Sequence, residues 1–262
     1  MGNNENDLLV DQQNTLCIGR DWGIYFGRLA QGDMQHQHYA LQLSIAVAHT
    51  LVVNAQAQLF TTKLAALVQS QVRHTMVSNG PQLLVVVNPA SALGKFYHKY
   101  YAGPVAEVEN QLTRRLRALA TDFGNNCIDR QAFIEQATVT LRQFEVGISE
   151  HDIGIDSRIQ RAIEYLQLHH KRPVPVAEIA DHCFLSESRF LHLFKEETGT
   201  TYKKTELWGR HMHALPKLTE QGIAKTALEF GFTDHAHFTR SFKDCFGFTP
   251  GRFIKNSKVF TI

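Results

Sequence analysis

The sequence of 262 residues predicts a two-domain α+β protein, with an N-terminal β-barrel that carries a helical hairpin and an all-α C-terminal domain. Three observations predict this class. Short apolar segments separated by turn residues fill the first hundred positions, two stretches with helical periodicity follow, and the last hundred positions contain one helical pattern twice. We expect a β domain over 1–104, the hairpin over 105–146, a linker over 147–156 and the helical domain over 157–262.

Composition narrows the class of protein. Hydrophobic residues make up 44% of the chain and charged residues 20%, which is typical of a chain that forms a core. No apolar run approaches the roughly 20 residues that span a bilayer, so we expect no membrane partner. The four cysteines lie far apart and the first residues lack a signal-peptide pattern, which predicts a cytoplasmic protein.

Charge is distributed unevenly around a net charge of +2. From Asp156 onward the chain has 16 lysines and arginines against 12 aspartates and glutamates, whereas the part before it is mildly acidic. Locally concentrated cations favour phosphate binding, and ordinary scatter of charge is the alternative.

The β domain is predicted from segments such as WGIYFGRL, LQLSIAVA, LVVN and QLLVVVN, separated by QGD, SNGP and NPAS. Strands and turns that alternate every 8 to 12 residues or so are typical of a sandwich or barrel.

The hairpin is predicted because the apolar period changes after Gly103-Pro104. One helical stripe contains Val105, Val108, Leu112, Leu116, Leu119 and Phe123, and a second contains Ile134, Ala137, Leu141 and Phe144. These stripes can pack on the β domain or associate with a second copy, and we expect a homodimer. The segment VGISEHDIGID that follows has no apolar period and is predicted to be a linker.

A repeat in the helical domain predicts two helix-turn-helix units. AEIADHCFLSESRFLHLFKEETG begins at Ala177, and AKTALEFGFTDHAHFTRSFKDCFG begins at Ala224. Each copy is expected to form a short helix with small alanines (Ala180, Ala227), a turn, and a longer helix capped by Ser186 or Thr233.

The second helix of each unit has an apolar face and a polar face. Phe190, Leu193 and Phe194 are predicted to point into the core, as are Phe238, Ser241 and Phe242 in the second copy. The opposite faces, their edges and the helix starts carry two sets of residues. They are Ser186, Ser188, Arg189, Leu191, His192 and Lys195 in the first copy, and His235, Ala236, His237, Thr239, Arg240 and Lys243 in the second. Such faces suit a major groove, where arginine can bridge guanine and alanine or leucine can contact a thymine methyl group.

The segment GIAKTALEFGFTDHAHFTRSFKDCFGFTPGRF resembles the signature of the AraC/XylS family of bacterial transcription regulators, and the resemblance extends back to about Ser157. It implies two helix-turn-helix units that enter successive major grooves of double-stranded DNA, with RNA polymerase as a further partner. The family pattern places Ser188, Leu191 and His192, and then Ala236, His237 and Arg240, at base edges. An RNA- or protein-binding adaptor is the alternative use of this repeat.

The helix that joins the two units departs from the family pattern. Its sequence, YKKTELWGRHMHALPKLTEQ, contains Gly209 and Pro216. Because proline lacks the N–H that an inner helical turn requires, we expect a kink or an end near Leu215.

The β domain resembles, more loosely, the cupin-like sensory domain of such regulators. The segment GDMQHQHYALQLSIAV supplies an HxH pair, His36 and His38, and His74 stands where a later strand supplies a third ligand. Gln42 replaces the acid of that pattern, and an amide binds divalent metals less well than a carboxylate. We expect His36, His38, Gln42 and His74 to bind a small-molecule effector, without a cofactor; a metal site and purely structural histidines are alternatives.

Other features argue against catalysis. No nucleophile elbow, Walker loop or dinucleotide-binding glycine motif follows a predicted strand, so we expect no enzyme activity. A cupin-type metalloenzyme fused to a DNA-binding domain is the rival interpretation. The remaining helical histidines, His169, His170, His211 and His213, are expected to be solvated.

Overall fold

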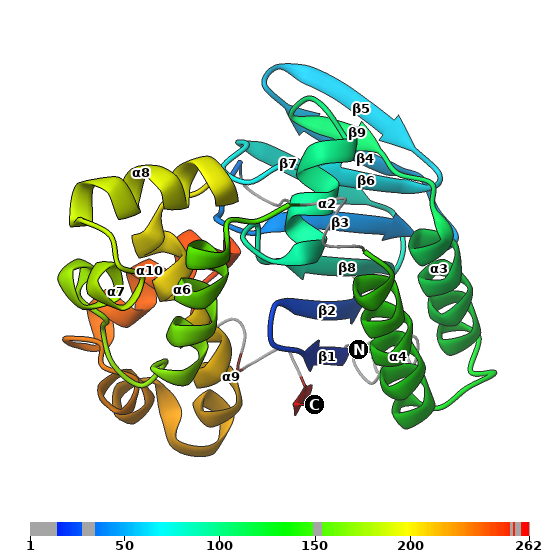
Figure 1. Cartoon of the computed structure of the whole chain (residues 1–262). Helices are drawn as coiled ribbons and strands as arrows, with labels where there is room; N and C mark the ends of the chain where they lie inside the picture. Colours follow the sequence, from blue (N-terminus) through cyan, green and yellow to red (C-terminus); the bar gives the residue numbers. More distant parts are fainter. Residues whose placement is uncertain (1–14, 28–34, 149–153, 252–253, 255–257, 262) are drawn as a thin grey trace.

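The computed structural model of the chain describes residues 15–27, 35–148, 154–251, 254 and 258–261. Figure 1 shows a β domain in the middle, a pair of helices on one side of it and the C-terminal helices on the other. The predicted two-domain α+β class is confirmed. Of the predicted linker, 149–153 lie outside the described residues.

Ten strands lie in two sheets within the described part of the chain. Their bounds are β1 Thr15–Ile18, β2 Trp22–Gly27, β3 Leu41–Ala46, β4 Leu51–Ala55, β5 Gln58–Thr62, β6 Ala65–Val68, β7 His74–Ser78, β8 Gln82–Val87, β9 Val105–Glu107 and β10 Lys258–Thr261. The larger sheet has the order β10-β1-β2-β8-β3-β6-β9, and the smaller has the order β5-β4-β7. The expected closed barrel is therefore wrong, because among the described residues no ladder of strands joins the two sheets.

Alternation along β3 explains how the two faces of the larger sheet are used. Leu41, Leu43 and Ile45 belong to the core beneath the helical pair. Gln42 and Ser44 point to the other face, where the Gln42 amide also contacts Met76 of the smaller sheet. All six residues of β3 are buried, so both faces of this strand are covered.

Helices occupy the remaining described regions. Their bounds are α2 Ala92–Tyr100, α3 Gln111–Gly124, α4 Arg130–Gly147, α6 Ser157–Leu168, α7 Val176–His182, α8 Glu187–Thr198, α9 Tyr202–Glu229 and α10 His235–Phe246. Helix α2 was not predicted; Ser91 caps it by accepting a hydrogen bond from the Gly94 amide.

The predicted hairpin is formed by α3 and α4, with two corrections. Val105 lies in strand β9, and α3 begins only after Asn110, which caps it in a reciprocal pair with Thr113. The apolar stripes of both helices lie in one core with β2, β3 and β8. These stripes therefore pack on the sheet and are not available to a second copy.

The helix joining the two helix-turn-helix units continues through Pro216, and the expected kink near Leu215 is wrong. Helical geometry is instead broken at Gly222, with φ 78° and ψ 172°. A backbone with this positive φ favours glycine. The proline itself costs one backbone hydrogen bond, but its fixed φ is compatible with a helix.

The end of the described chain returns to the β domain. Strand β10 pairs in parallel with β1, from Thr15 opposite Lys258 to Ile18 opposite Thr261. Residues 258–261, which the predicted boundary at 157 assigns to the helical domain, therefore belong to the larger sheet. Among the described residues, no helix is both long and apolar enough to cross a membrane.

Candidate nucleic-acid interface

The first helix-turn-helix unit has the predicted architecture. Ala180 of α7 is buried in one hydrophobic core with the inward side chains of α8, Phe190, Leu193 and Phe194. The Ser186 hydroxyl caps α8 by accepting a hydrogen bond from the Arg189 amide at 3.4 Å. Sequence periodicity therefore placed both the core face and the helix start correctly.

The second unit needs one correction, in the residue that caps α10. Asp234, not Thr233, is the N-cap, and its Oδ1 accepts a hydrogen bond from the His237 amide at 2.6 Å. This bond lowers the pKa of Asp234. Aspartate ranks above threonine as an N-cap, which was the signal available in the sequence. Phe238, Ser241 and Phe242 are buried as predicted.

Both predicted outward faces are accessible in this structure. The exposed residues are Ser186, Ser188, Arg189, Leu191, His192 and Lys195 on the first unit, and His235, Ala236, Arg240 and Lys243 on the second. His237 and Thr239 are half-buried at the edge of the second face. No acidic residue lies at the centre of either face, although Glu196 and Asp244 are exposed near the ends of the two helices. The two faces combine cationic, imidazole, hydroxyl and small apolar groups that can contact phosphates and base edges.

The histidines of α9 are not solvated, contrary to expectation. His211 is fully buried, its Nε2 lies 2.9 Å from the Ser241 hydroxyl, and its ring contacts Phe238. Burial lowers its pKa well below the usual value, so the ring is neutral. His213 is half-buried and stacks on His170 with a centroid separation of 3.7 Å. These rings join α9 to the second unit and to the segment that follows α6.

A buried ion pair on α9 was not predicted. Arg210 Nε lies 3.0 Å from Glu206 Oε1, and both side chains are about 97% or more buried. Arg210 also donates to the Gly231 carbonyl at 2.9 Å and lies over the Phe232 ring at 4.1 Å. It thus fixes the turn of the second unit to the joining helix. A Glu-Arg pair four residues apart is usually exposed, so the sequence carried no signal of its burial.

The second unit also packs against the β domain. The Tyr39 amide donates to the Asp244 carbonyl at 2.9 Å, and the Ala40 amide donates to that of Cys245. The Tyr39 hydroxyl donates to Asn88 at 2.8 Å and lies 3.0 Å from the Thr205 hydroxyl. Tyr39, Ala40 and Ile18 therefore belong to the hydrophobic core of the second unit.

The predicted effector residues lie together beside this contact. A nitrogen from each of His36, His38 and His74, which we call the histidine cluster, lies within 4.8 Å of the others. His38 Nε2 is 2.9 Å from Gln42 Oε1. His38 and His74 are buried and His36 is half-buried.

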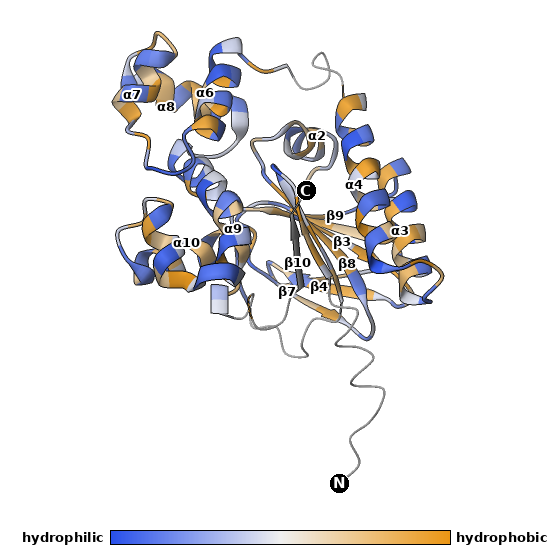
Figure 2. Ribbon diagram, turned by 90° about the horizontal axis from the view of Figure 1, so that it is seen from below, coloured by the Kyte–Doolittle hydropathy of each residue, from blue (hydrophilic) through white to orange (hydrophobic). Residues whose placement is uncertain are grey.

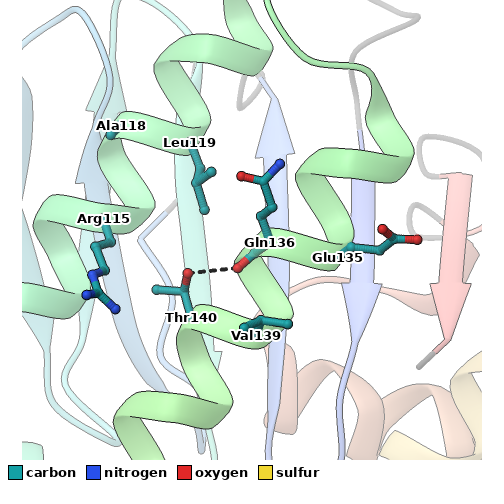
Figure 3. Close-up of a pocket in the computed structure, with 7 residues that line it drawn as sticks. All are labelled: Arg115, Ala118, Leu119, Glu135, Gln136, Val139 and Thr140. Carbon is teal, nitrogen blue, oxygen red and sulfur yellow. Dashed lines mark hydrogen bonds between the residues drawn. The ribbon is translucent and has the colours of Figure 1, made fainter.

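A hollow on the hairpin is a second candidate site (Figure 3). It lies on the outer side of the hairpin and is lined by Arg115, Ala118, Leu119, Glu135, Gln136, Val139 and Thr140. Figure 2 shows these two helices on the side of the sheet away from α8 and α10.

Comparisons with known proteins match the helical part most strongly. The Helix-turn-helix domain family matches residues 179–256. The arabinose operon regulatory protein of Salmonella typhimurium is 33% identical over 102 residues, covering 38% of this chain and 36% of that protein. The Escherichia coli protein of the same name is 32% identical over 116 residues, covering 43% and 40%. The chain thus aligns with well under half of each relative.

Structural similarity extends further. ToxT from Vibrio cholerae in its apo form superposes with a TM-score of 0.57 at 11% identity, covering 91% of this chain and 98% of ToxT. ToxT with a bound unsaturated fatty acid gives a TM-score of 0.53 at 11% identity, covering 91% and 96%. At this identity the likeness shows a shared fold over both domains.

Proposed function

Since the C-terminal part of this chain is a helix-turn-helix domain of the AraC/XylS family, we propose that the protein is a sequence-specific transcription regulator that inserts α8 and α10 into successive major grooves of DNA. One observation carries the proposal. Both second helices bury matching phenylalanines and leave an exposed polar face with no acidic residue at its centre. The family is one of non-enzymatic regulators, and the proposal involves no catalysis; RNA polymerase remains a predicted partner.

The exposed residues divide into two roles. Arg240 and His192, each near the middle of its helix, would contact base edges together with exposed neighbours toward the helix starts, because these side chains offer directional donors. Lys195 and Lys243, one helical turn further on, would neutralise phosphates. Selection of duplexes from a random pool tests the proposal. We expect a motif with two informative blocks about 10 base pairs apart, and a pool without enrichment would contradict it.

Arg240→Ala and Lys243→Ala should have different effects. Loss of Arg240 should cost about 1–3 kcal/mol of binding to the selected site and relax preference at one base pair, whereas loss of Lys243 should weaken all sequences similarly. The salt slope of binding should fall by about 1 for Lys243→Ala. Fluorescence anisotropy on selected and scrambled duplexes measures both. Equal losses on the two duplexes for both variants would contradict the division of roles.

The hollow between α3 and α4 is the proposed surface for the homodimer. Val139 is 51% exposed there, with Arg115 on α3 and Glu135 on α4 beside it. In a two-fold arrangement the same patch meets itself, so Arg115 of one copy can face Glu135 of the other. The inner stripes are already used within the chain, so the outer face is the part left for a partner.

Val139→Glu should therefore weaken self-association. Because an apolar contact is lost and a carboxylate is added to the patch that already holds Glu135, the dissociation constant of the dimer should rise at least tenfold, or about 1.4 kcal/mol. Sedimentation equilibrium of the full chain measures it. Val77→Glu is the matched control, since Val77 is 49% exposed on the smaller sheet; equal effects of the two variants would exclude this surface.

We further propose that a small ligand at His36, His38, Gln42 and His74 modulates DNA binding. The position of these residues supports the proposal, since His38 directly precedes the segment that hydrogen-bonds to α10. ToxT binds a fatty acid in one of the matching structures. The cluster here is compact and polar, which suits an ion or a small polar molecule better than an acyl chain.

A further inference from the structure

The backbone holds the three imidazoles of the histidine cluster together. His36 and His74 form an isolated antiparallel bridge, with N–H to carbonyl distances of 2.9 and 2.8 Å in the two directions. Ring centroids of His36 and His74 are 4.5 Å apart, and that of His38 is 5.5 and 5.2 Å from them. Histidines from two separate segments thus converge on one point at the junction of the β domain with α10.

Hydrogen bonds to backbone carbonyls orient the His38 and His74 rings, as is usual for histidines that bind a metal. Nδ1 of His74 lies 2.9 Å from the Val72 carbonyl, and Nδ1 of His38 lies 2.9 Å from the Ala40 carbonyl. A carbonyl at this distance takes the proton of Nδ1, which leaves the lone pair on Nε2. Metal-bound histidines in proteins show this arrangement, with the second nitrogen bonded to a backbone oxygen.

The Gln42 side chain adds an oxygen to the three imidazoles. Both ring nitrogens of His38 lie 2.9 Å from oxygen acceptors, the Ala40 carbonyl and Gln42 Oε1. The Gln42 amide nitrogen donates to Ser44 at 3.2 Å, which keeps its oxygen toward His38. A neutral imidazole has one N–H and satisfies one oxygen.

A cation satisfies this geometry. In a tetrahedral site with ligand atoms about 2.1 Å from the ion, neighbouring ligand atoms lie about 3.4 Å apart, and His38 Nε2 and Gln42 Oε1 are 2.9 Å apart. The histidine nitrogens lie within 4.8 Å of one another, so the rings must rotate to bring them to the roughly 3.4 Å of a tetrahedral site. Imidazole ligands favour zinc, nickel, cobalt and copper over magnesium or calcium.

We propose that His36, His38 and His74, with the Gln42 oxygen, bind one divalent first-row transition-metal ion, and that this ion stabilises the contact between the β domain and α10. The inference deepens the proposed function by naming the ligand. The histidine cluster packs directly against the end of α10. A methyl group on Gly247, which ends this helix, would lie 2.6 Å from His36 and 3.0 Å from His38. Metal binding would restrict residues 36–40, and so favour the docked position of α10.

Cobalt titration of the full chain tests the site directly. The probe is Co²⁺ added to chelator-treated protein without a polyhistidine tag, followed by its d–d absorption. We expect saturation at one ion per chain and displacement by Zn²⁺. His36→Gln and His38→Gln should each weaken binding at least tenfold, whereas His182→Gln, at an exposed histidine outside the cluster, should leave it unchanged. No saturable absorption, or equal binding by all variants, would overturn the site.

Hydrogen exchange tests the link to α10 without DNA, so its outcome is separate from that of the proposed function. With Zn²⁺ bound, the Tyr39 and Ala40 amides should exchange at least about fivefold more slowly in the wild type. Unchanged or faster exchange at saturating Zn²⁺ would overturn the coupling. The wild-type titration requires no variant to fold, and circular dichroism of His36→Gln, at the half-buried member of the cluster, checks that its loss of binding is local.

Discussion

Arg210→Met is expected to lower the free energy of unfolding by about 3 kcal/mol. The change removes the ion pair with Glu206, the hydrogen bond to the Gly231 carbonyl and the contact with the Phe232 ring. A buried carboxylate that loses its partner costs about 3–5 kcal/mol. The lower end applies because Lys203 still reaches the other Glu206 oxygen at 2.9 Å. Urea denaturation followed by circular dichroism measures the loss.

A double variant separates charge from packing in this prediction. Arg210→Met combined with Glu206→Gln should recover more than half of the lost stability, because no buried charge is then left alone. DNA binding should also be weakest for Arg210→Met and stronger for the double variant, since Arg210 holds the turn of the second unit against the joining helix. If the double variant is no more stable than Arg210→Met, the lone carboxylate is not the cause.

Phe238→Ala is expected to cost about 3–5 kcal/mol and to abolish binding to the second half of the DNA site. Phe238 is fully buried, with ring centroids 4.8 Å from Phe232 and 4.7 Å from His211. Removing the ring leaves a cavity beneath α10, and the helix loses the surface that sets its orientation. Thermal unfolding and anisotropy on duplexes carrying each half-site measure the two effects.

Leu228→Ala is the matched control for this cavity, because Leu228 lies in the same unit but is 68% exposed. Its change in stability should stay within about 0.5 kcal/mol. Retained binding of Phe238→Ala to the second half-site would mean that α10 does not depend on this core for its orientation.

The helix-turn-helix units could be predicted from the sequence because their order is local. Phe190 and Phe194 are one helical turn apart, as are Phe238 and Phe242, so the period alone identified the buried faces. The residues on the opposite side of each helix were then predicted to point outward, and most of them are exposed in the structure. Asp234 was missed by one position, within the usual uncertainty of a helix boundary.

Long-range pairing could not be predicted in the same way. The bonds from Tyr39 and Ala40 to Asp244 and Cys245 join segments more than 200 residues apart, and no period along the chain encodes them. His211 looked like a surface residue of a polar helix, but the phenylalanines of α10 cover it. The open arrangement of the sheets likewise depends on which strand edges meet, which apolar alternation leaves undetermined.

The parallel pairing of β10 with β1 has a consequence for synthesis on the ribosome. Thr15 emerges from the exit tunnel long before Lys258, yet these residues are partners at one edge of the larger sheet. A nascent chain therefore presents that edge uncovered until β10 has been made, and unpaired strand edges attract other chains. A premature stop codon before β10 would leave this edge as a template for aggregation.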